Sequence, residues 1–318
     1  MTAAKRGPRR ARLRRSGGRA PEEQDGMTPA EHGSSRLRLR QAEGRPAGGM
    51  TVGVSHGRAS VRFSDLVRSE WTKFRSLRSM WWSLAVMVAF SVTITLLVGS
   101  DTGGEYHAMS AAEKRTWDPT GASLNSFFAG QLAISVLGIL VVTSEYATGM
   151  IRTSLAAMPR RGRLLAAKTL VFAVIALVAG QVTAFATFLA GQAVIGHQKG
   201  VPTATLGDHG VLPAVLGTGL YLAAIGLLAV AVGTLMRATA GGLALQVGIT
   251  LLVPAFGGLL PSWIRKAFAF WPSLGGPEVR NVHPDPAYPH AWMNLSGMTA
   301  GIAILLVAAF AVFRRREV

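Results

Sequence analysis

Six long uncharged runs constrain this chain more than any other feature of its sequence. They cover residues 81–99, 123–142, 170–190, 212–236, 239–260 and 292–313, and none contains Asp, Glu, Lys, Arg or His. A helix needs about 20 apolar residues to cross roughly 30 Å of hydrocarbon at about 1.5 Å per residue. Because no water is available there, a crossing segment must satisfy its own backbone hydrogen bonds, as a helix does. The runs therefore predict an all-α polytopic membrane protein with six transmembrane helices.

Two segments of different composition precede the first run. Residues 1–58 are rich in Arg, Gly, Ser and Pro and show no apolar period. We expect them to be a disordered basic leader or, with Met27 or Met50 as the true start, a start-site artefact. Residues 59–79 place apolar and aromatic residues at helical spacing with basic residues on other faces, which predicts an amphipathic helix lying in the membrane interface. The six-span domain then covers 80–318.

The basic residues predict the orientation of the spans. The formal net charge of +17 would also suit a nucleic-acid binder. Much of that charge lies at the ends of the apolar runs, however, where membrane placement explains it better, so no nucleic-acid partner is expected. With both termini inside, the inner flanks hold 13 Lys and Arg residues and the outer loops hold six. This excess predicts a multi-pass protein of the cell membrane with cytoplasmic termini.

The connection between the fifth and sixth runs is irregular. Residues 257–276 mix aromatic residues with Pro and Gly, which makes the segment too interrupted to span. We expect short re-entrant helices that dip back into the outer leaflet. Pro254 is expected to kink the fifth span just before this segment.

No enzyme site is predicted. The chain has no cysteine, and its seven histidines lie in loops or in the leader without the spacing of a metal site. Residues 162–169 nearly match the phosphate-binding pattern G-x-x-x-x-G-K-[ST], but Ala167 replaces the second Gly, no strand precedes it and an apolar run follows. We therefore expect no catalytic, metal or cofactor site on this chain.

The loop between the second and third runs carries the strongest functional signal. Residues 144–168 contain five basic residues, which marks a cytoplasmic face. Met150, Ile151 and Leu155 give a short helix an apolar face beside Arg152, and such a helix suits docking into a partner's groove. The alternative is an interfacial helix resting on lipid. Because the spans offer only neutral polar groups, the energy for uphill transport would come from the partner.

Two segments carry a resemblance to a known family. VRSEWTKFRSLRSMWW (67–82) and SEYATGMIRTSLAAMPRRGRLLAAK (144–168) are similar to segments of the permease subunits of ABC-2 type exporters, particularly the versions common in actinobacteria. The resemblance covers residues 60–318. It implies an elbow helix at 61–79, a coupling helix at 146–158 and re-entrant helices between spans five and six. It also implies a separate cytosolic ATPase that binds ATP and Mg²⁺, with two copies of each subunit in a transporter.

The sequence therefore predicts the permease subunit of an ATP-driven ABC exporter, paired with a second copy as a homodimer or heterodimer. Coupling to the ATPase is expected through the 144–163 loop, with the role assigned to Glu145, Gly149, Met150, Ile151, Arg152 and Leu155. The candidates for a translocation path are Gln131, Gln181 and Gln246, although neutral polar groups also join helices to one another. A non-transporting membrane scaffold or anchor of an envelope complex and an intrinsic secondary carrier are the alternatives.

Overall fold

The computed structural model describes residues 62–149, 161–257, 259, 261, 268–283 and 285–315. The chain divides into two units, Met1–Gly57 and Arg58–Val318, and every described residue belongs to the second. The predicted leader therefore lies outside the described residues. Within the ranges given, the chain is helical and contains no strand, which confirms the predicted all-α class.

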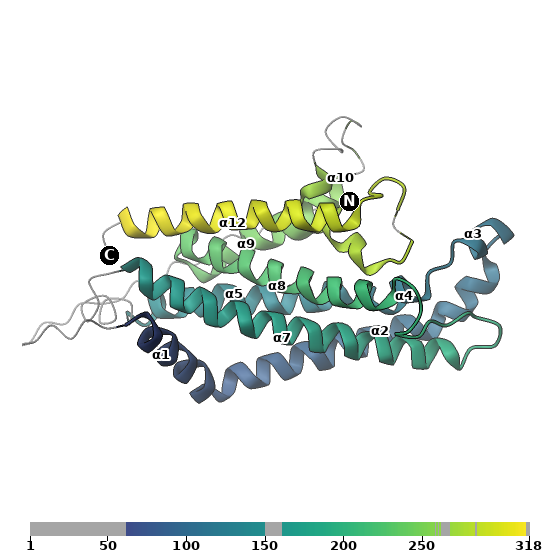
Figure 1. The fold of residues 1–318 in the computed structure, drawn as a ribbon, viewed down its shortest axis with the longest axis horizontal. Coiled ribbons are helices and arrows are strands. Elements are labelled where there is room, and N and C mark those ends of the chain that lie inside the picture. Colours follow the sequence, from purple (N-terminus) through teal and green to yellow (C-terminus); the bar gives the residue numbers. More distant parts are fainter. Residues whose placement is uncertain are drawn as a thin grey trace, which may run out of the picture. The chain divides into compact units, whose positions relative to one another are not determined.

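Among the described residues, six helical segments are long and apolar enough to cross a membrane, which confirms the predicted number of spans. Figure 1 shows them running alongside one another. Five are single helices: α2 (Arg78–Ala108), α5 (Phe127–Ala147), α7 (Arg161–Gly196), α8 (Val211–Met236) and α12 (Ala291–Arg315). The remaining span is composite and consists of α9 (Thr239–Val247), the π-helical turn η1 (Gly248–Leu252) and α10 (Val253–Gly257).

The shorter elements lie before and between the spans. The helix α1 (Phe63–Ser76) precedes α2 and is separated from it by Leu77, whose extended backbone interrupts the helix. The others are α3 (Ala111–Arg115), α4 (Pro119–Ser123) and the 3₁₀ turns η2 (Phe268–Phe270) and η3 (Gly276–Arg280).

Two spans extend well beyond the apolar runs that predict them. The helix α2 continues past residue 99 to Ala108 and carries Asp101 and Glu105, whereas α7 begins at Arg161, ahead of the run that starts at 170. A charged residue ends the part of a helix that lipid tolerates, but it does not end the helix, because a helix also satisfies its own backbone hydrogen bonds in water. The start of α7 is rich in helix formers, whereas the end of α2 contains the poor helix formers Gly103 and Gly104 and is held by Gln198, which donates to the main-chain oxygens of Gly99 and Ser100. The apolar runs therefore mark the crossing segments and not the helix ends.

The helix α8 lies at the centre of the described spans. It packs against α5, α7, α9 and α12, and 83% of its apolar window is buried inside the protein. Glycines permit this close packing. A Cβ added to Gly138 of α5 would lie 2.5 Å from the main-chain oxygen of Gly226, and one added to Gly180 of α7 would lie 2.6 Å from that of Gly219. Small residues at such crossings let helix backbones approach closely, as membrane bundles require.

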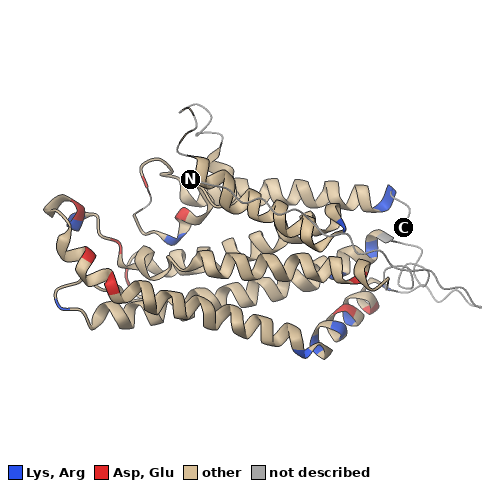
Figure 2. Ribbon diagram, turned by 180° about the vertical axis from the view of Figure 1, so that it is seen from behind, with Lys and Arg blue, Asp and Glu red and all other residues tan. Residues whose placement is uncertain are grey.

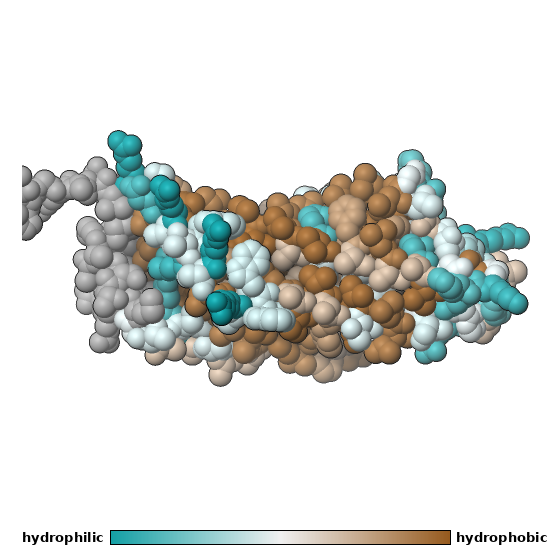
Figure 3. Space-filling model, turned by 90° about the horizontal axis from the view of Figure 1, so that it is seen from below, coloured by the Kyte–Doolittle hydropathy of each residue, from teal (hydrophilic) through white to brown (hydrophobic). Residues whose placement is uncertain are grey.

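Charge and hydropathy are distributed as a membrane protein requires. Figure 2 shows the charged residues gathered towards the two ends of the long helices and on α1, with uncharged residues between them. The face drawn in Figure 3 has a hydrophobic band between more hydrophilic ends. Large apolar side chains of several spans are exposed, among them Phe90, Val178 and Ile304. A surface of this kind is stable only against lipid or another apolar surface.

The fifth span departs from a regular helix just before Pro254. In the π-helical turn η1, the carbonyl of Ile249 would accept from the N–H of residue 254, but proline has none. The indole Nε1 of Trp271 donates to the Ile249 oxygen at 2.9 Å instead. The sequence predicted a kink at this proline; the structure shows a π-helical turn whose free carbonyl is satisfied by a side chain from the following segment.

Candidate functional site

The helix α1 supplies the first part of the candidate site. Asp65 accepts from the main-chain N–H of Arg62 at 3.1 Å and places a negative charge in the first turn, where the helix dipole favours it. Leu66, Glu70 and Phe74 follow at four-residue spacing and form the buried face of the helix. Phe74 packs against α7. This spacing therefore places the carboxylate of Glu70 within the apolar face through which α1 packs on the spans.

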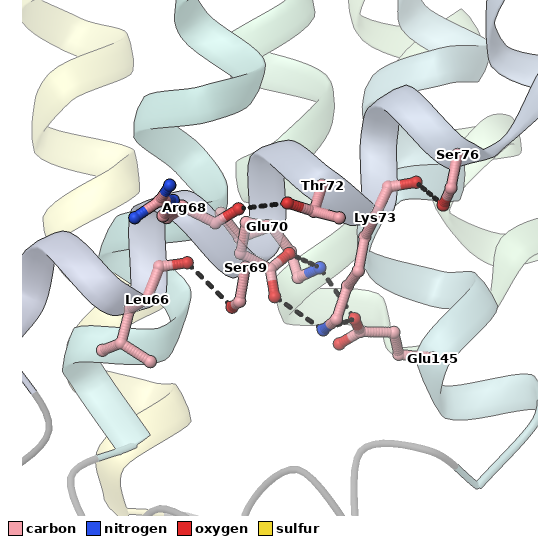
Figure 4. Close-up of polar contacts among 9 residues, drawn as sticks. Leu66, Arg68, Ser69, Glu70, Thr72, Lys73, Ser76 and Glu145 are labelled. Carbon is pink, nitrogen blue, oxygen red and sulfur yellow. Dashed lines mark hydrogen bonds and ion pairs between the residues drawn. The ribbon is translucent and has the colours of Figure 1, made fainter.

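Four charged side chains meet at this face, and we call them the ionic cluster: Glu70, Lys73, Glu145 and Lys168. Lys168 Nζ lies 2.7 Å from Glu70 Oε2 and 2.8 Å from Glu145 Oε1. Lys73 Nζ lies 2.6 Å from Glu70 Oε1 and 3.5 Å from Glu145 Oε1. Figure 4 shows Glu70 and Glu145 turned towards the two ammonium groups from different helices. The cluster thus joins α1, the end of α5 and the start of α7.

The burial of these side chains gives their ionic contacts a large effect on stability. The exposed fraction of the side chain is 4% for Glu70, 9% for Lys168 and 10% for Glu145, whereas Lys73 is 38% exposed. A buried charge without a partner is costly, because water no longer solvates it. Two carboxylates and two ammonium groups cancel, so the four side chains can be buried together. The cluster is therefore a single electrostatic unit in which each buried charge depends on the others.

The protonation of the cluster follows from the same contacts. Burial favours the neutral form of Glu70, but the charge and hydrogen bonds of Lys168 and Lys73 outweigh it, and the pKa of Glu70 is lowered. Burial likewise favours neutral Lys73, but Glu70 and Glu145 outweigh it, and the pKa of Lys73 is raised. Both pKa shifts reflect stabilisation of the ionised forms, so Glu70 and Lys73 stay charged at neutral pH.

The ionic cluster closes the base of the predicted coupling loop. Glu145 lies in the last turn of α5, whose C-cap is Thr148, and Gly149 follows with a φ of +69°. Lys168 lies in α7, in the helix that follows the loop. The Lys168–Glu145 contact therefore ties the two flanks of the loop together, and the Lys168–Glu70 contact ties both to α1. A displacement of either flank would be transmitted to α1 through charge-assisted hydrogen bonds.

A second group of polar side chains runs along α5 inside the spans. Gln131, fully buried, accepts through Oε1 from the hydroxyls of Tyr221 on α8 and Ser273 after η2, the latter at 2.9 Å. Gln246 of α9 donates to Ser135 Oγ at 3.2 Å, and the Ser135 hydroxyl donates to the main-chain oxygen of Gln131 at 2.7 Å. We call these five residues the polar seam. They hold α5, α8, α9 and the segment after η2 together within the hydrophobic interior.

The comparison with protein families identifies the chain. A family model described as "ABC-2 family transporter protein" matches residues 66–253, which is more than half of the chain and includes all four residues of the ionic cluster. The chain belongs to this family. None of the curated proteins matches it. The resemblance inferred from 67–82 and 144–168 is therefore confirmed at the level of the family.

Membership of the ABC-2 family places the chain in a functional class. It is the membrane permease of an ABC transporter and a multi-pass membrane protein, a membrane subunit and not a catalytic one. Permeases of this family usually work with an ATPase partner. Within the part of the chain that the structure describes, no group of three or more His, Asp or Glu residues could hold a metal ion.

The structure separates the residues predicted for coupling. Glu145 is in the ionic cluster and Gly149 follows the end of α5. The other four assigned residues lie outside the described residues: Met150, Ile151, Arg152 and Leu155. The coupling role of all six stays a prediction.

The three glutamines predicted for a translocation path fall in two places. Gln131 and Gln246 both belong to the polar seam, where Ser135 connects them. Gln181 lies apart on α7 and donates to the main-chain oxygen of Leu216 on α8 at 2.9 Å. Each of the three contacts a neighbouring helix or segment within this chain, and their path role stays a prediction.

Sequence reasoning missed that Glu70 and Lys168 belong to one site. From the sequence, Lys168 is counted only among the five basic residues of 144–168, and Glu70 receives no role. The signal was in the spacing, because Glu70 lies midway between Leu66 and Phe74, and Lys168 lies between Leu164 and Phe172. A charge in the middle of an apolar stripe is buried with the stripe and needs an opposite charge nearby.

Proposed function

We propose that this chain is the permease subunit of an ATP-driven exporter of the cell membrane, and that it couples to a separate cytosolic ATPase through the 144–163 loop. The ATPase would bind ATP and Mg²⁺, and a second permease copy, identical or homologous, would complete the transporter. Membership of the ABC-2 family supports the class of protein and the kind of partner. Closure of the ATPase on ATP would push on the loop and reorient the spans.

The observation that carries the coupling proposal is the position of the ionic cluster at the base of the loop. Lys168 holds Glu145 at 2.8 Å and Glu70 at 2.7 Å, so α5, α7 and α1 are linked at the point where the loop leaves and rejoins the spans. A loop that receives a mechanical load needs such a junction, because otherwise the load would be absorbed by local bending. The buried pairs supply stiffness with little exposed surface.

Co-purification with the ATPase tests the coupling role. The double variant Ile151→Ala/Arg152→Ala should lower the amount of ATPase recovered with the permease by about tenfold, because it removes an apolar anchor and a charge from the proposed docking segment. Arg115→Ala is the matched control, since Arg115 is an exposed basic residue of α3 on the opposite side of the spans in the proposed topology. Equal recovery with all three proteins would exclude docking through this loop.

Transport assays separate the proposed exporter from the alternatives. In vesicles, the permease with its ATPase should move substrate only when ATP is present. Transport by the permease alone, driven by an ion gradient, would indicate a secondary carrier. An assembled complex with no ATP-dependent transport would indicate a scaffold.

The absence of cysteine makes the proposed orientation directly testable. Ser76, at the end of α1, and Thr116, after α3, are both exposed and lie at opposite ends of the first span. With cytoplasmic termini, Thr116→Cys should react with a membrane-impermeant maleimide in intact cells. Ser76→Cys should react only after the membrane is permeabilised. The reverse pattern would invert the proposed topology.

We propose that α1 is an elbow helix in the membrane interface and that the segment after span five is re-entrant. Exposed Phe63 and Trp71 on α1 support the first proposal, since aromatic residues favour the interface. The contacts of Trp271 with Ile249 and of Ser273 with Gln131 support the second, because Ile249 and Gln131 both lie inside spans. Residues 258, 260 and 262–267 of this segment lie outside the described residues.

The path assigned to Gln131, Gln181 and Gln246 is also part of the proposal. Each amide keeps one buried atom without a hydrogen-bond partner among the described residues: Nε2 of Gln131, Oε1 of Gln181 and Oε1 of Gln246. An unpaired buried polar atom is costly and is available to water or a passing polar group. Replacing Gln246 with Leu should therefore change the substrate affinity more than the assembly of the transporter.

A further inference from the structure

A groove beside the ionic cluster has the chemistry of a lipid site. It has a volume of about 470 Å³ and lies between the end of α1, the start of α2, the end of α5 and the start of α7. This volume falls in the usual range for small-molecule sites. Glu145 and Lys73 of the ionic cluster line one part of it, and apolar side chains line most of the rest.

The apolar part of the groove is continuous with the lipid-facing surface of the spans. Its walls include Met80 at the start of α2, Leu140 on α5 and Phe172 on α7. The side of α5 that carries Leu140 continues as exposed apolar surface at Val136 and Leu132, one and two turns earlier. An acyl chain lying along this face of α5 could therefore enter the groove without leaving its apolar environment.

The polar part of the groove offers both signs of charge. Glu145 uses Oε1 for Lys168 and Lys73, and its Oε2 accepts no hydrogen bond from the described residues. Lys73 is partly exposed and has three N–H donors, of which the contacts with Glu70 and Glu145 use two. The groove also reaches the start of α2, which has no side-chain cap. There the N–H of Met80 donates to the main-chain oxygen of Leu77 at 3.0 Å, whereas the N–H groups of Arg78 and Ser79 have no acceptor among the described residues.

We propose that this groove binds a zwitterionic phospholipid with a primary amine, such as phosphatidylethanolamine, from the leaflet at the α1 end of the spans. The ammonium group of the lipid donates to Glu145 Oε2, its phosphate accepts from Lys73 and from the start of α2, and an acyl chain follows Leu140. The ionic cluster carries no net charge, so a lipid with no net charge keeps the site neutral. Choline offers no N–H to the carboxylate, and phosphatidylglycerol offers no cation.

Lipid titration of the purified full chain, followed by native mass spectrometry, tests this site. Dilauroyl phosphatidylethanolamine should bind about tenfold more tightly than the phosphatidylcholine and phosphatidylglycerol of the same chain length, the factor expected for one charge-assisted hydrogen bond. Glu145→Gln should remove most of that preference, because the amide cannot pair with the ammonium charge. Equal affinity for the three lipids, or a preference for phosphatidylglycerol, would overturn the proposal.

A matched pair of surface variants separates the groove from the general lipid surface. Leu140→Trp fills the groove and should weaken phosphatidylethanolamine binding about tenfold. Leu220→Trp, on α8, adds the same bulk outside the groove and should leave the affinity unchanged; the two residues are 37% and 40% exposed. Both positions face outward, so neither variant disturbs the packed interior. An equal loss in the two variants would mean that the lipid binds elsewhere.

Discussion

The replacement of Lys168 by Met tests whether the ionic cluster is the electrostatic unit that its geometry implies. Methionine keeps most of the side-chain volume but removes the ammonium group, which lies 2.7 Å from Glu70 and 2.8 Å from Glu145. Glu70 keeps its 2.6 Å contact with Lys73, whereas Glu145 keeps only the 3.5 Å approach of that same ammonium group. One buried carboxylate is thus left almost without a partner.

The expected loss of stability follows from the partners that the two carboxylates keep. Breaking a buried ion pair by removing one partner costs about 3–5 kcal/mol. Because Lys73 still compensates Glu70, we expect the lower end, about 3 kcal/mol. At about 2–4 °C per kcal/mol for chains of 150–250 residues, the melting temperature in detergent should fall by roughly 6–12 °C. The seven tryptophans allow this to be measured by intrinsic fluorescence.

A second variant distinguishes charge from packing. In Lys168→Met/Glu145→Gln a neutral amide replaces the carboxylate that has lost its partner, so the double variant should recover more than half of the stability lost in the single variant. Lys199→Met is the control, since Lys199 is exposed and its side chain makes no ion pair within the described ranges; its melting temperature should not change. A fall below about 2 °C for Lys168→Met, or additive losses in the double variant, would refute the reasoning.

Three further predictions use the same thermal assay. Gly138→Ala should cost about 1–3 kcal/mol, because its Cβ would meet the main-chain oxygen of Gly226 at 2.5 Å; a neutral result would mean that α5 and α8 can separate freely. Tyr221→Phe should cost about 1–3 kcal/mol by removing a hydroxyl that donates to buried Gln131, and an unchanged melting temperature would show that the polar seam adds no stability. Because the pKa of Glu70 is lowered on folding, the carboxylate stabilises the protein above the unfolded pKa of about 4.3, and this stability is lost as pH falls through the folded pKa. Glu70→Gln should therefore flatten the fall in melting temperature at acid pH, and parallel profiles of melting temperature against pH for the two proteins would contradict this.

The sequence was sufficient for the spans because lipid imposes one simple rule. A run such as 212–236, with no charge over the length of a membrane, has no stable alternative to a crossing helix. The positions of α2 and α7 beyond their runs could not be predicted in the same way. The start of α7 is helical by local propensity, whereas the end of α2, with Gly103 and Gly104, depends on its contacts with Gln198, and a charge count measures neither.

The site could be predicted only in part, because it depends on contacts between distant segments. Glu145 was chosen for its place at the end of the second span, but its partners Lys73 and Lys168 are 72 and 23 residues away. Glu70 and Lys168 are 98 residues apart. Spacing within α1 and α7 indicates that both are buried. Only the packing of α1 on α7 shows that they meet.

The bond from Trp271 to Ile249 has a consequence for how span five responds to force. Before Pro254 the continuity of the main-chain hydrogen bonds is interrupted, and the gap is closed by an indole from a later part of the chain. One net hydrogen bond is worth about 0.5–1.5 kcal/mol, so rotating a single ring away is enough to release the carbonyl. Withdrawal of the segment that carries Trp271 would therefore leave the Ile249 carbonyl without a partner and lower the cost of bending the span between Thr239 and Val253.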